Sequence, residues 1–190
     1  MFRRQVSPEI EIRLFDSADA KAVYSVVERN RSNLRQWLPW VDITTSADAI
    51  RRFIETIAIP QYKESRSPNC GIWIRGEFAG SIGCHAINAA HNEVSIGYWL
   101  DAGHQGKGVI SDCCAAMLDY LFDELNLHRA TVECATGNFR SCAIPERLGF
   151  TREGVKREAQ RIDGRWLDLA VWSILDREWR QRRGSLPRTR

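Results

Sequence analysis

"IGYWLDAGHQGKGVIS", residues 96–111, joins a strand-like segment to a helix-like segment through a lysine flanked by glycines. Large apolar side chains up to Leu100 favour a β-strand, whereas apolar residues recur every three to four positions over residues 108–125, as on one face of a helix. Glycine lets the backbone approach an anion closely, and the unpaired N–H groups and dipole of a helix N-terminus favour negative charge. The junction therefore predicts a site for an anion such as a pyrophosphate, unless it is only a turn before a helix.

Three glycine motifs that precede helices can be compared with this junction. A P-loop, G-x-x-x-x-G-K-[ST], does not fit, because Asp101 stands at its first glycine position and Gly108 at its hydroxyl position. The dinucleotide motif G-x-G-x-x-G does not fit either, because Ser111 replaces its third glycine and no βαβ unit surrounds it. The pattern [QR]-x-x-G-x-[GA] matches at Gln105 and Gly108 but departs at Ile110.

A second glycine, Gly97, interrupts the strong strand pattern "VSIGYWL". Glycine inside a strand indicates a bulge or the close approach of another group. A bulge here would separate this strand from its next neighbour and leave backbone amides free for a ligand.

The periodicity of the remaining sequence predicts one domain with strands and helices in mixed order. A first strand, "EIEIRLF", precedes a helix capped by Asp16 or Ser17, and a second helix begins at Ser46 and ends near Pro60. Further strands are predicted at residues 70–75, 78–87, 93–100 and 129–135, followed by two long strands joined at Asp163-Gly164. Further helices are predicted at residues 108–125, 141–148 and 176–183.

The bulk composition indicates a soluble globular protein. Of 190 residues, 44% are hydrophobic and 27% charged, no apolar run approaches the ~20 residues that span a bilayer, and the N-terminus lacks an apolar signal core. We therefore expect a cytoplasmic protein. The net charge is +3, but residues 177–190 carry six arginines and one glutamate (+5), which leaves −2 for the rest. A solvated helix end is the commoner meaning of such a run, so nucleic-acid binding is not favoured.

The six cysteines and four histidines indicate neither disulfides nor a metal site. The cysteines lie in apolar segments without a C-x-x-C pair, which predicts reduced, buried thiols. The histidines lack a ligand spacing such as H-x-x-x-H, so no metal is expected.

Three segments together carry a family resemblance. "IGYWLDAGHQGKGVI", "GNFRSCAIPERLGF" and "WLPWVD" resemble the GNAT superfamily of acetyl-CoA-dependent N-acetyltransferases, specifically the RimJ/RimL type, over nearly the whole chain. The resemblance implies a single α/β (α+β) domain over residues 1–183, with a flexible basic tail at 184–190. We expect a mixed, mostly antiparallel seven-stranded sheet with helices on both faces, in the order β-α-α-β-β-β-α-β-α-β-β. Branch members often form dimers, so a homodimer or larger oligomer is expected.

The resemblance also implies where acetyl-CoA binds. Its pantetheine would pair with the main chain of Tyr98, Trp99 and Leu100, and Asn138 would hold a pantetheine amide or, equally well, cap a helix. Lys107 would add positive charge near the pyrophosphate. The N–H groups expected to bind the pyrophosphate belong to Gln105, Gly106, Lys107, Gly108, Val109 and Ile110.

The catalytic residues are less clearly marked by the resemblance. Ser141 matches the family serine that donates a proton to the departing CoA thiolate, although a serine in a first helical turn is often a cap. An ammonium cannot attack a thioester, so some group must accept the proton of the amine. Relatives often carry glutamate where this chain has Ser95. Glu93, on the same strand face, is then the first candidate base, Glu158 the second and Asp168 a third.

The identity of the acceptor amine is the part of the function that the sequence defines least. Trp37 and Trp40 of "WLPWVD" fall where this branch shapes the acceptor entrance, unless they only anchor a loop on the core. The favoured function is acetylation of a primary amine, by analogy the N-terminal amine of a ribosomal or other protein. Alternatives are a small-molecule amine such as a polyamine, antibiotic or toxin, and a non-catalytic acyl-CoA-binding module. Fold-level similarity alone does not separate them.

Overall fold

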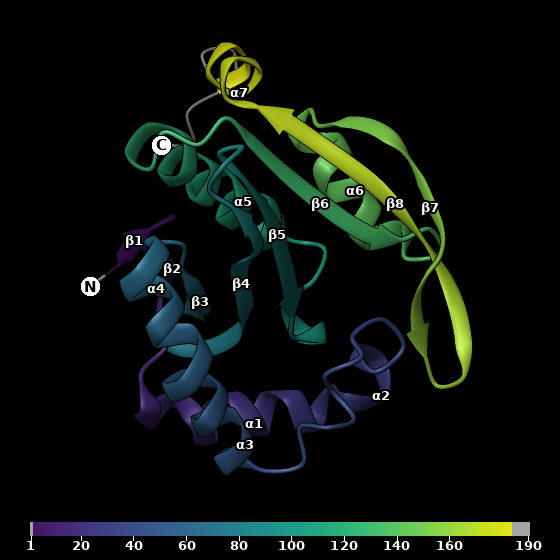
Figure 1. The fold of residues 1–190 in the computed structure, drawn as a ribbon. Coiled ribbons are helices and arrows are strands. Elements are labelled where there is room, and N and C mark those ends of the chain that lie inside the picture. Colours follow the sequence, from purple (N-terminus) through teal and green to yellow (C-terminus); the bar gives the residue numbers. More distant parts are fainter. Residues whose placement is uncertain (1, 184–190) are drawn as a thin grey trace.

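The computed structural model describes residues 2–183 and contains one eight-stranded sheet with helices on both faces (Figure 1). The strand order across the sheet is β1-β2-β3-β4-β5-β6-β8-β7, with β5 and β6 parallel and all other neighbours antiparallel. The strands are β1 (Arg3–Gln5), β2 (Ile10–Leu14), β3 (Asn69–Ile74), β4 (Glu77–Asn88), β5 (Glu93–Leu100), β6 (Arg129–Ala135), β7 (Thr151–Ile162) and β8 (Arg165–Leu175). The predicted tail at 184–190 lies outside the described residues.

The five predicted helices are present in the predicted order, and the short helices α2 and η3 are additional. The helices are η1 (Ser17–Asp19), α1 (Ala20–Arg29), α2 (Arg31–Leu34), α3 (Ala47–Phe53), η2 (Ile54–Ala58), α4 (Ile59–Ser65), η3 (Ala102–His104), α5 (Val109–Asp119), η4 (Tyr120–Glu124), α6 (Phe139–Leu148) and α7 (Asp176–Arg183). Asp16 caps the first of them, and its carboxylate accepts the N–H of Ala18 at 2.9 Å. Ser46 caps α3 in the same way through the N–H of Ala49. Both predicted helix starts are therefore confirmed.

The sheet has one strand more than the seven that the sequence predicts. The additional strand, β1, pairs with β2 at the sheet edge, where Arg3 lies opposite Arg13. Its three residues, Arg-Arg-Gln, are too few and too polar to show an alternating apolar pattern. The hydrogen bonds to β2, rather than burial of its side chains, make this segment a strand.

The second predicted helix also runs further than expected, because Pro60 does not end it. The chain passes from α3 through the π-helical turn η2 into α4, which continues to Ser65. Proline lacks an N–H and clashes with the carbonyl four residues earlier, but a π-turn widens the helix at this point. Pro60 therefore begins the last segment of one long helix instead of terminating it.

The two halves of the sheet diverge between β5 and β6 (Figure 1). Among the described residues these strands pair only where Glu93, Val94 and Ser95 face residues 129–131. The predicted separation of the strands is therefore present, but Gly97 is not bulged against β4 and lies in register with Gly83. The irregularity in this pair lies between His85 and Asn88 instead.

Buried residues form one cluster on each face of the sheet. The larger cluster packs α5, η4 and α7 against the sheet, and the other packs α1, α2, α3 and η2 against it. Ile50, Ile54 and Ala58 give the long helix its buried stripe, whereas Phe53 and Ile57 remain exposed. Phe53 and Ile57 follow the same three-to-four spacing in the sequence, but their side chains lie on the exposed side of the helix.

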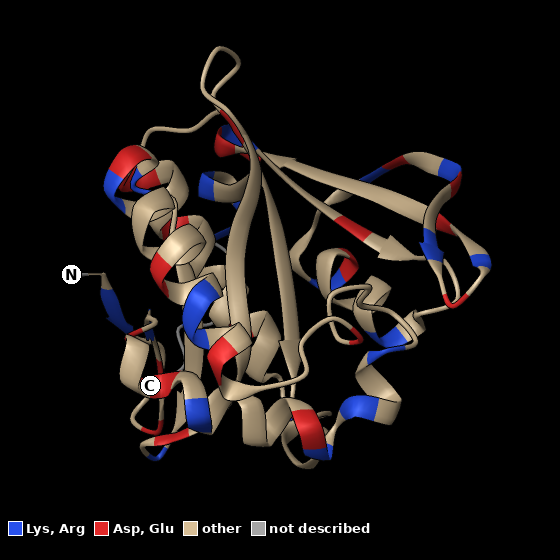
Figure 2. Cartoon of the chain, turned by 60° about the horizontal axis from the view of Figure 1, so that its bottom comes forward, with Lys and Arg blue, Asp and Glu red and all other residues tan. Residues whose placement is uncertain are grey.

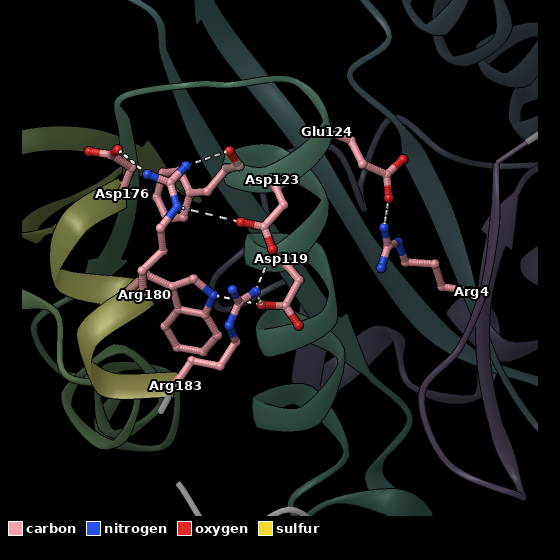
Figure 3. A network of polar contacts seen from close by, with 9 residues as sticks. Arg4, Asp119, Asp123, Glu124, Asp176, Arg180 and Arg183 are labelled. Atoms are coloured by element: carbon pink, nitrogen blue, oxygen red, sulfur yellow. Dashed lines mark hydrogen bonds and ion pairs between the residues drawn. The ribbon is translucent and has the colours of Figure 1, made fainter. Parts of the chain in front are cut away.

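The helix α7 is docked on the domain, whereas the sequence predicts a short exposed helix. The indole of Trp179 is buried, and its Nε1 donates to Asp119 Oδ1 at 2.8 Å. Arg180 and Arg183 form ion pairs with acidic residues at the end of α5 and in η4 (Figure 3). Part of the C-terminal arginine run thus neutralises carboxylates of the same domain. In the view of Figure 2, both charge signs are spread over the helices.

Candidate active site

A cavity of about 1780 Å³ occupies the opening between β5 and β6. Residues 96–100 of β5 form one wall and residues 132–135 of β6 form the other. Residues of α5 and α6 line it on one face of the sheet, and residues of α3 and of the segment after α2 line it on the other. The cavity therefore passes between the strands and is reached from both faces.

The loop that precedes α5 forms one end of this cavity. Gly106 and Gly108 have φ angles of 76° and 80°, and Gly108 is the N-cap residue of α5. The first main-chain bond of the helix is donated by Asp112 to the carbonyl of Gly108, so the N–H groups of residues 109–111 precede the helical ladder. A Cβ added at Gly106 would meet no atom within 4 Å. These open N–H groups at a helix N-terminus fit a pyrophosphate.

Two arginines of α6, rather than Lys107, bring positive charge to the cavity lining. The Nζ of Lys107 donates to the carbonyl of Gly103 at 3.0 Å, and Lys107 is not among the residues that line the cavity. Arg140 donates to Gln105 Oε1 at 2.9 Å, and Arg147 donates to Ser111 Oγ at 2.8 Å. Both arginines line the cavity. The sequence shows them within the α6 segment but gives no sign that α6 lies beside this loop.

A buried polar cluster fixes the loop to α1. The carboxylate of Asp101 accepts from Arg29 Nη2 at 2.6 Å and from Asn30 Nδ2 at 2.8 Å. Asn30 Oδ1 accepts the N–H of Ala102 at 3.0 Å. Burial acts to raise the pKa of Asp101, but the hydrogen bonds from Arg29 and Asn30 outweigh it, and the pKa lies below its ordinary value. The end of α1 thus determines where the loop after β5 begins.

The start of α6 faces β5 across the opening. Asn138 caps the helix, and its Oδ1 accepts the N–H of Ser141 at 3.2 Å. The hydroxyl of Tyr98 donates to the carbonyl of Ser141 at 3.1 Å. Burial raises the pKa of Tyr98 well above its ordinary value, so this hydroxyl stays a donor. All three residues line the cavity together with Trp99 and Leu100, and their contact with acetyl-CoA stays a prediction.

Comparison with known proteins agrees with this geometry. A family model described as "Acetyltransferase (GNAT) domain" matches residues 9–151. This chain belongs to the GNAT acetyltransferase family. YdaF of Bacillus subtilis (strain 168) is 34% identical over 179 residues, which cover 94% of this chain and 98% of YdaF. The enzyme is an acetyl-CoA-dependent N-acetyltransferase.

Two solved GNAT structures share the fold over most of their length. RimL, named a ribosomal L7/L12 alpha-N-protein acetyltransferase, was solved in complex with coenzyme A; its TM-score is 0.88 at 26% identity, over 92% of this chain and 98% of RimL. The microcin C7 self immunity acetyltransferase MccE was solved in complex with acetyl-CoA and AMP. Its TM-score is 0.85 at 25% identity, over 90% of this chain and 94% of that chain.

The carboxylates that the sequence offers as the base of this GNAT enzyme lie outside the cavity lining. Glu93 forms an ion pair with Arg129 Nε at 3.3 Å. Glu158 is exposed on β7, where its N–H donates to Asp168 Oδ1 at 2.8 Å. None of the three candidate bases, Glu93, Glu158 and Asp168, therefore lines the cavity together with Ser141. Their role as a base stays a prediction.

Two titratable residues that the sequence reasoning missed do line the cavity of the acetyltransferase. His85 lies on β4 and Glu133 on β6, one on each side of β5. Neither belongs to a recognisable motif, because they are 48 positions apart in the sequence. The sheet order, which places β5 between β4 and β6, is the only signal that relates them.

Aromatic side chains line the opposite end of the cavity. Trp37 and Trp40 are half-buried in the segment after α2, and Trp40 lies with its ring centroid 6.0 Å from that of Trp99. Phe53 and Ile57 of the long helix also line the cavity. Both tryptophans thus pack on the domain and border the cavity at once.

Membrane-spanning helices and metal-type clusters are both absent from the described residues of this GNAT domain. No helix is long and apolar enough to cross a membrane within residues 2–183. Over the same range no three histidine, cysteine or acidic residues cluster as a metal site would require. All six cysteines are free thiols, and all but Cys142 are buried.

Proposed function

We propose that this enzyme transfers the acetyl group of acetyl-CoA directly to the N-terminal α-amine of a protein, of the ribosomal type, within a ternary complex. The observation that carries the proposal is the single cavity that passes between β5 and β6 and is lined from both faces of the sheet. Acetyl-CoA on the α5 and α6 side and an amine on the α1 and α3 side would meet between the strands. The similarity to RimL, named an alpha-N-protein acetyltransferase, supports the acceptor class.

On the cofactor side, the proposal assigns the pyrophosphate to the N–H groups of residues 105–110. The main chain of residues 98–100 and the side chain of Asn138 would align the pantetheine, and Ser141 would donate a proton to the CoA thiolate. Acetyl-CoA supplies the thioester carbonyl that the amine attacks. Open N–H groups at a helix start are suited to holding an anion, which supports the first of these assignments.

On the acceptor side, the lining favours a peptide over a polyamine. Phe53 and Ile57 are 37% and 51% exposed, and with Trp37 and Trp40 they add apolar surface to the cavity lining. A polyamine needs carboxylates along its length, whereas the described lining holds only Asp112, on α5, and Glu133. Small-molecule acylation is the second candidate, because MccE is a self immunity acetyltransferase solved with AMP.

Peptide acetylation tests this proposal directly. We expect release of free CoA from acetyl-CoA in the presence of short peptides that begin with serine or alanine. Thiol titration measures the released CoA, and mass spectrometry measures the acetylated peptide. The matched controls are the same peptides with a formylated N-terminus and an internal lysine, which should not react. Turnover of spermidine or of the blocked peptide, without turnover of the free one, would contradict the N-terminal acceptor.

Replacing Trp40 with alanine separates a role in acceptor binding from a role in packing. We expect Trp40→Ala to raise the KM for the peptide about 10-fold while the dissociation constant of acetyl-CoA changes less than twofold. The reason is that the indole borders the acceptor end of the cavity and contacts Trp99 rather than the loop at 105–108. Steady-state kinetics and calorimetry measure the two values. An equal increase in the KM for the peptide and in the dissociation constant of acetyl-CoA would indicate that Trp40 serves packing alone.

We further propose that the enzyme acts as a cytoplasmic homodimer or larger oligomer. The outer strand β7 is exposed along most of its length, with Val155 41% exposed, and Trp166 of β8 is 55% exposed. An edge strand with unpaired main-chain groups, beside exposed apolar side chains such as Val155 and Trp166, suits association with a second chain. The six thiols, all free, are consistent with a reducing compartment.

A further inference from the structure

His85, Gly97 and Glu133 lie on one face of three neighbouring strands, at the point where the sheet opens. His85 on β4 is paired with Ser95 on β5, which is paired in turn with Thr131 on β6. Since side chains alternate along a strand, Gly97 shares the face of Ser95, and Glu133 shares the face of Thr131. The hydroxyls of Ser95 and Thr131, 2.6 Å apart, confirm that these faces coincide.

Gly97 makes room for the imidazole ring. A Cβ at position 97 would lie 3.1 Å from Cε1 and 3.4 Å from Nδ1 of His85. The ring therefore leans from β4 over the backbone of β5, into the space that a side chain at position 97 would fill. This is the close approach that a glycine inside a strand indicates. The ring is also accessible, because His85 is an exposed residue that lines the cavity.

The charged groups around His85 come from β5, β6 and α3. Glu133 is close enough for its charge to act on the imidazole, and its own carboxylate is paired with Lys156 of β7. On β5, Glu93 shares the strand face but is paired with Arg129. From α3, Arg52 lines the same cavity.

We propose that His85 is the general base of this acetyltransferase and that Glu133 is a positioning residue that orients and tunes its imidazole. The inference rests on the proposed direct transfer to an amine. One imidazole nitrogen takes a proton from the attacking amine while the new N–C bond forms. The C–S bond of the thioester then breaks, and the CoA thiolate leaves and is protonated. Overall, one amine proton ends on the imidazole and one proton from the protein or solvent ends on the thiol.

The protonation state of His85 suits this role at neutral pH. Packing of the imidazole over the backbone of β5 removes part of its hydration and lowers the pKa of His85 from its ordinary value of 6.5, although the residue stays accessible, whereas the charge of Glu133 acts to raise the pKa. The lowered pKa leaves a larger share of the imidazole neutral at pH 7, and the neutral form is the one able to accept a proton. Activity should fall as the pH drops through this lowered pKa, because the base is then already protonated.

Kinetics with a free N-terminal peptide test the assignment. We expect His85→Gln to lower kcat about 100-fold at pH 7, with the dissociation constant of acetyl-CoA unchanged within twofold. The matched control is His91→Gln, in the turn between β4 and β5, which should change kcat less than twofold. Glu133→Gln should shift the acidic limb of the kcat profile to lower pH, because the charge that raises the pKa of His85 is lost. NMR titration of the His85 imidazole in both proteins measures the same shift without an acceptor.

A less basic acceptor distinguishes a base from a structural residue. If His85 removes a proton, a peptide that begins with trifluoroalanine, whose amine is weakly basic, should lose much less activity in His85→Gln than an alanine peptide. An equal loss with both peptides would overturn the assignment. So would wild-type activity of His85→Gln, or a 100-fold loss in Glu93→Gln or Glu158→Gln instead. A wild-type enzyme inactive on every amine would contradict the proposed function and the base together, whereas these other outcomes contradict the base alone.

Discussion

Replacing Gly108 with glutamate is expected to weaken acetyl-CoA binding by more than about 100-fold, or about 2.7 kcal/mol. Gly108 has a φ of 80° and is the N-cap of α5, so its N–H group belongs to the set that would hold the pyrophosphate. A glutamate there adds a negative charge beside an anion and forces a side chain into the left-handed region, which costs about 1–2 kcal/mol. Calorimetric titration with acetyl-CoA measures the loss.

Gly164 provides a matched control for this variant. It has a φ of 76° in the turn between β7 and β8, and an added Cβ would meet nothing within 4 Å. Gly164→Glu therefore carries the same strain and the same charge away from the cavity lining, and we expect its affinity for acetyl-CoA to stay within twofold of wild type. If both variants bind equally well, the loop at residues 105–110 does not hold the pyrophosphate.

The sequence predicts the parts of this enzyme that depend on local patterns. The helix at residues 108–125, the strand before it and the Asp163-Gly164 hairpin are all present, because each depends on periodicity or on turn residues within a few positions. Pro60 is misleading for the same reason: a proline ends most helices, but here a π-turn accommodates it. Three-residue strands such as β1 carry no pattern at all.

The site is predictable only where it is continuous in sequence. The loop at residues 105–110 and the start of α6 each form a local motif, and the structure brings both to one cavity. His85 and Glu133 meet only because β5 lies between β4 and β6, which is a property of the sheet order. A search for a base in one strand leads to Glu93, whose carboxylate is engaged by Arg129.

Replacing Ser141 with alanine is expected to lower kcat by about 10²–10³-fold without destabilising α6. The helix cap is made by the side chain of Asn138 to the N–H of Ser141, so the serine hydroxyl is not the capping group. The alanine variant keeps that N–H and therefore keeps the cap, and the free energy of unfolding should change by less than about 0.5 kcal/mol. Steady-state kinetics and denaturant unfolding measure the two quantities.

Asn138→Ala is the comparison variant, because it removes the helix cap that Ser141→Ala keeps. Loss of the cap should lower the free energy of unfolding by about 1 kcal/mol. A catalytic proton donor at Ser141 predicts that Ser141→Ala loses turnover at constant stability, with acetyl-CoA affinity within twofold of wild type. If Ser141→Ala instead loses stability and turnover in proportion, as Asn138→Ala would through its cap, the hydroxyl has only a structural role. The proton for the CoA thiolate must then come from water.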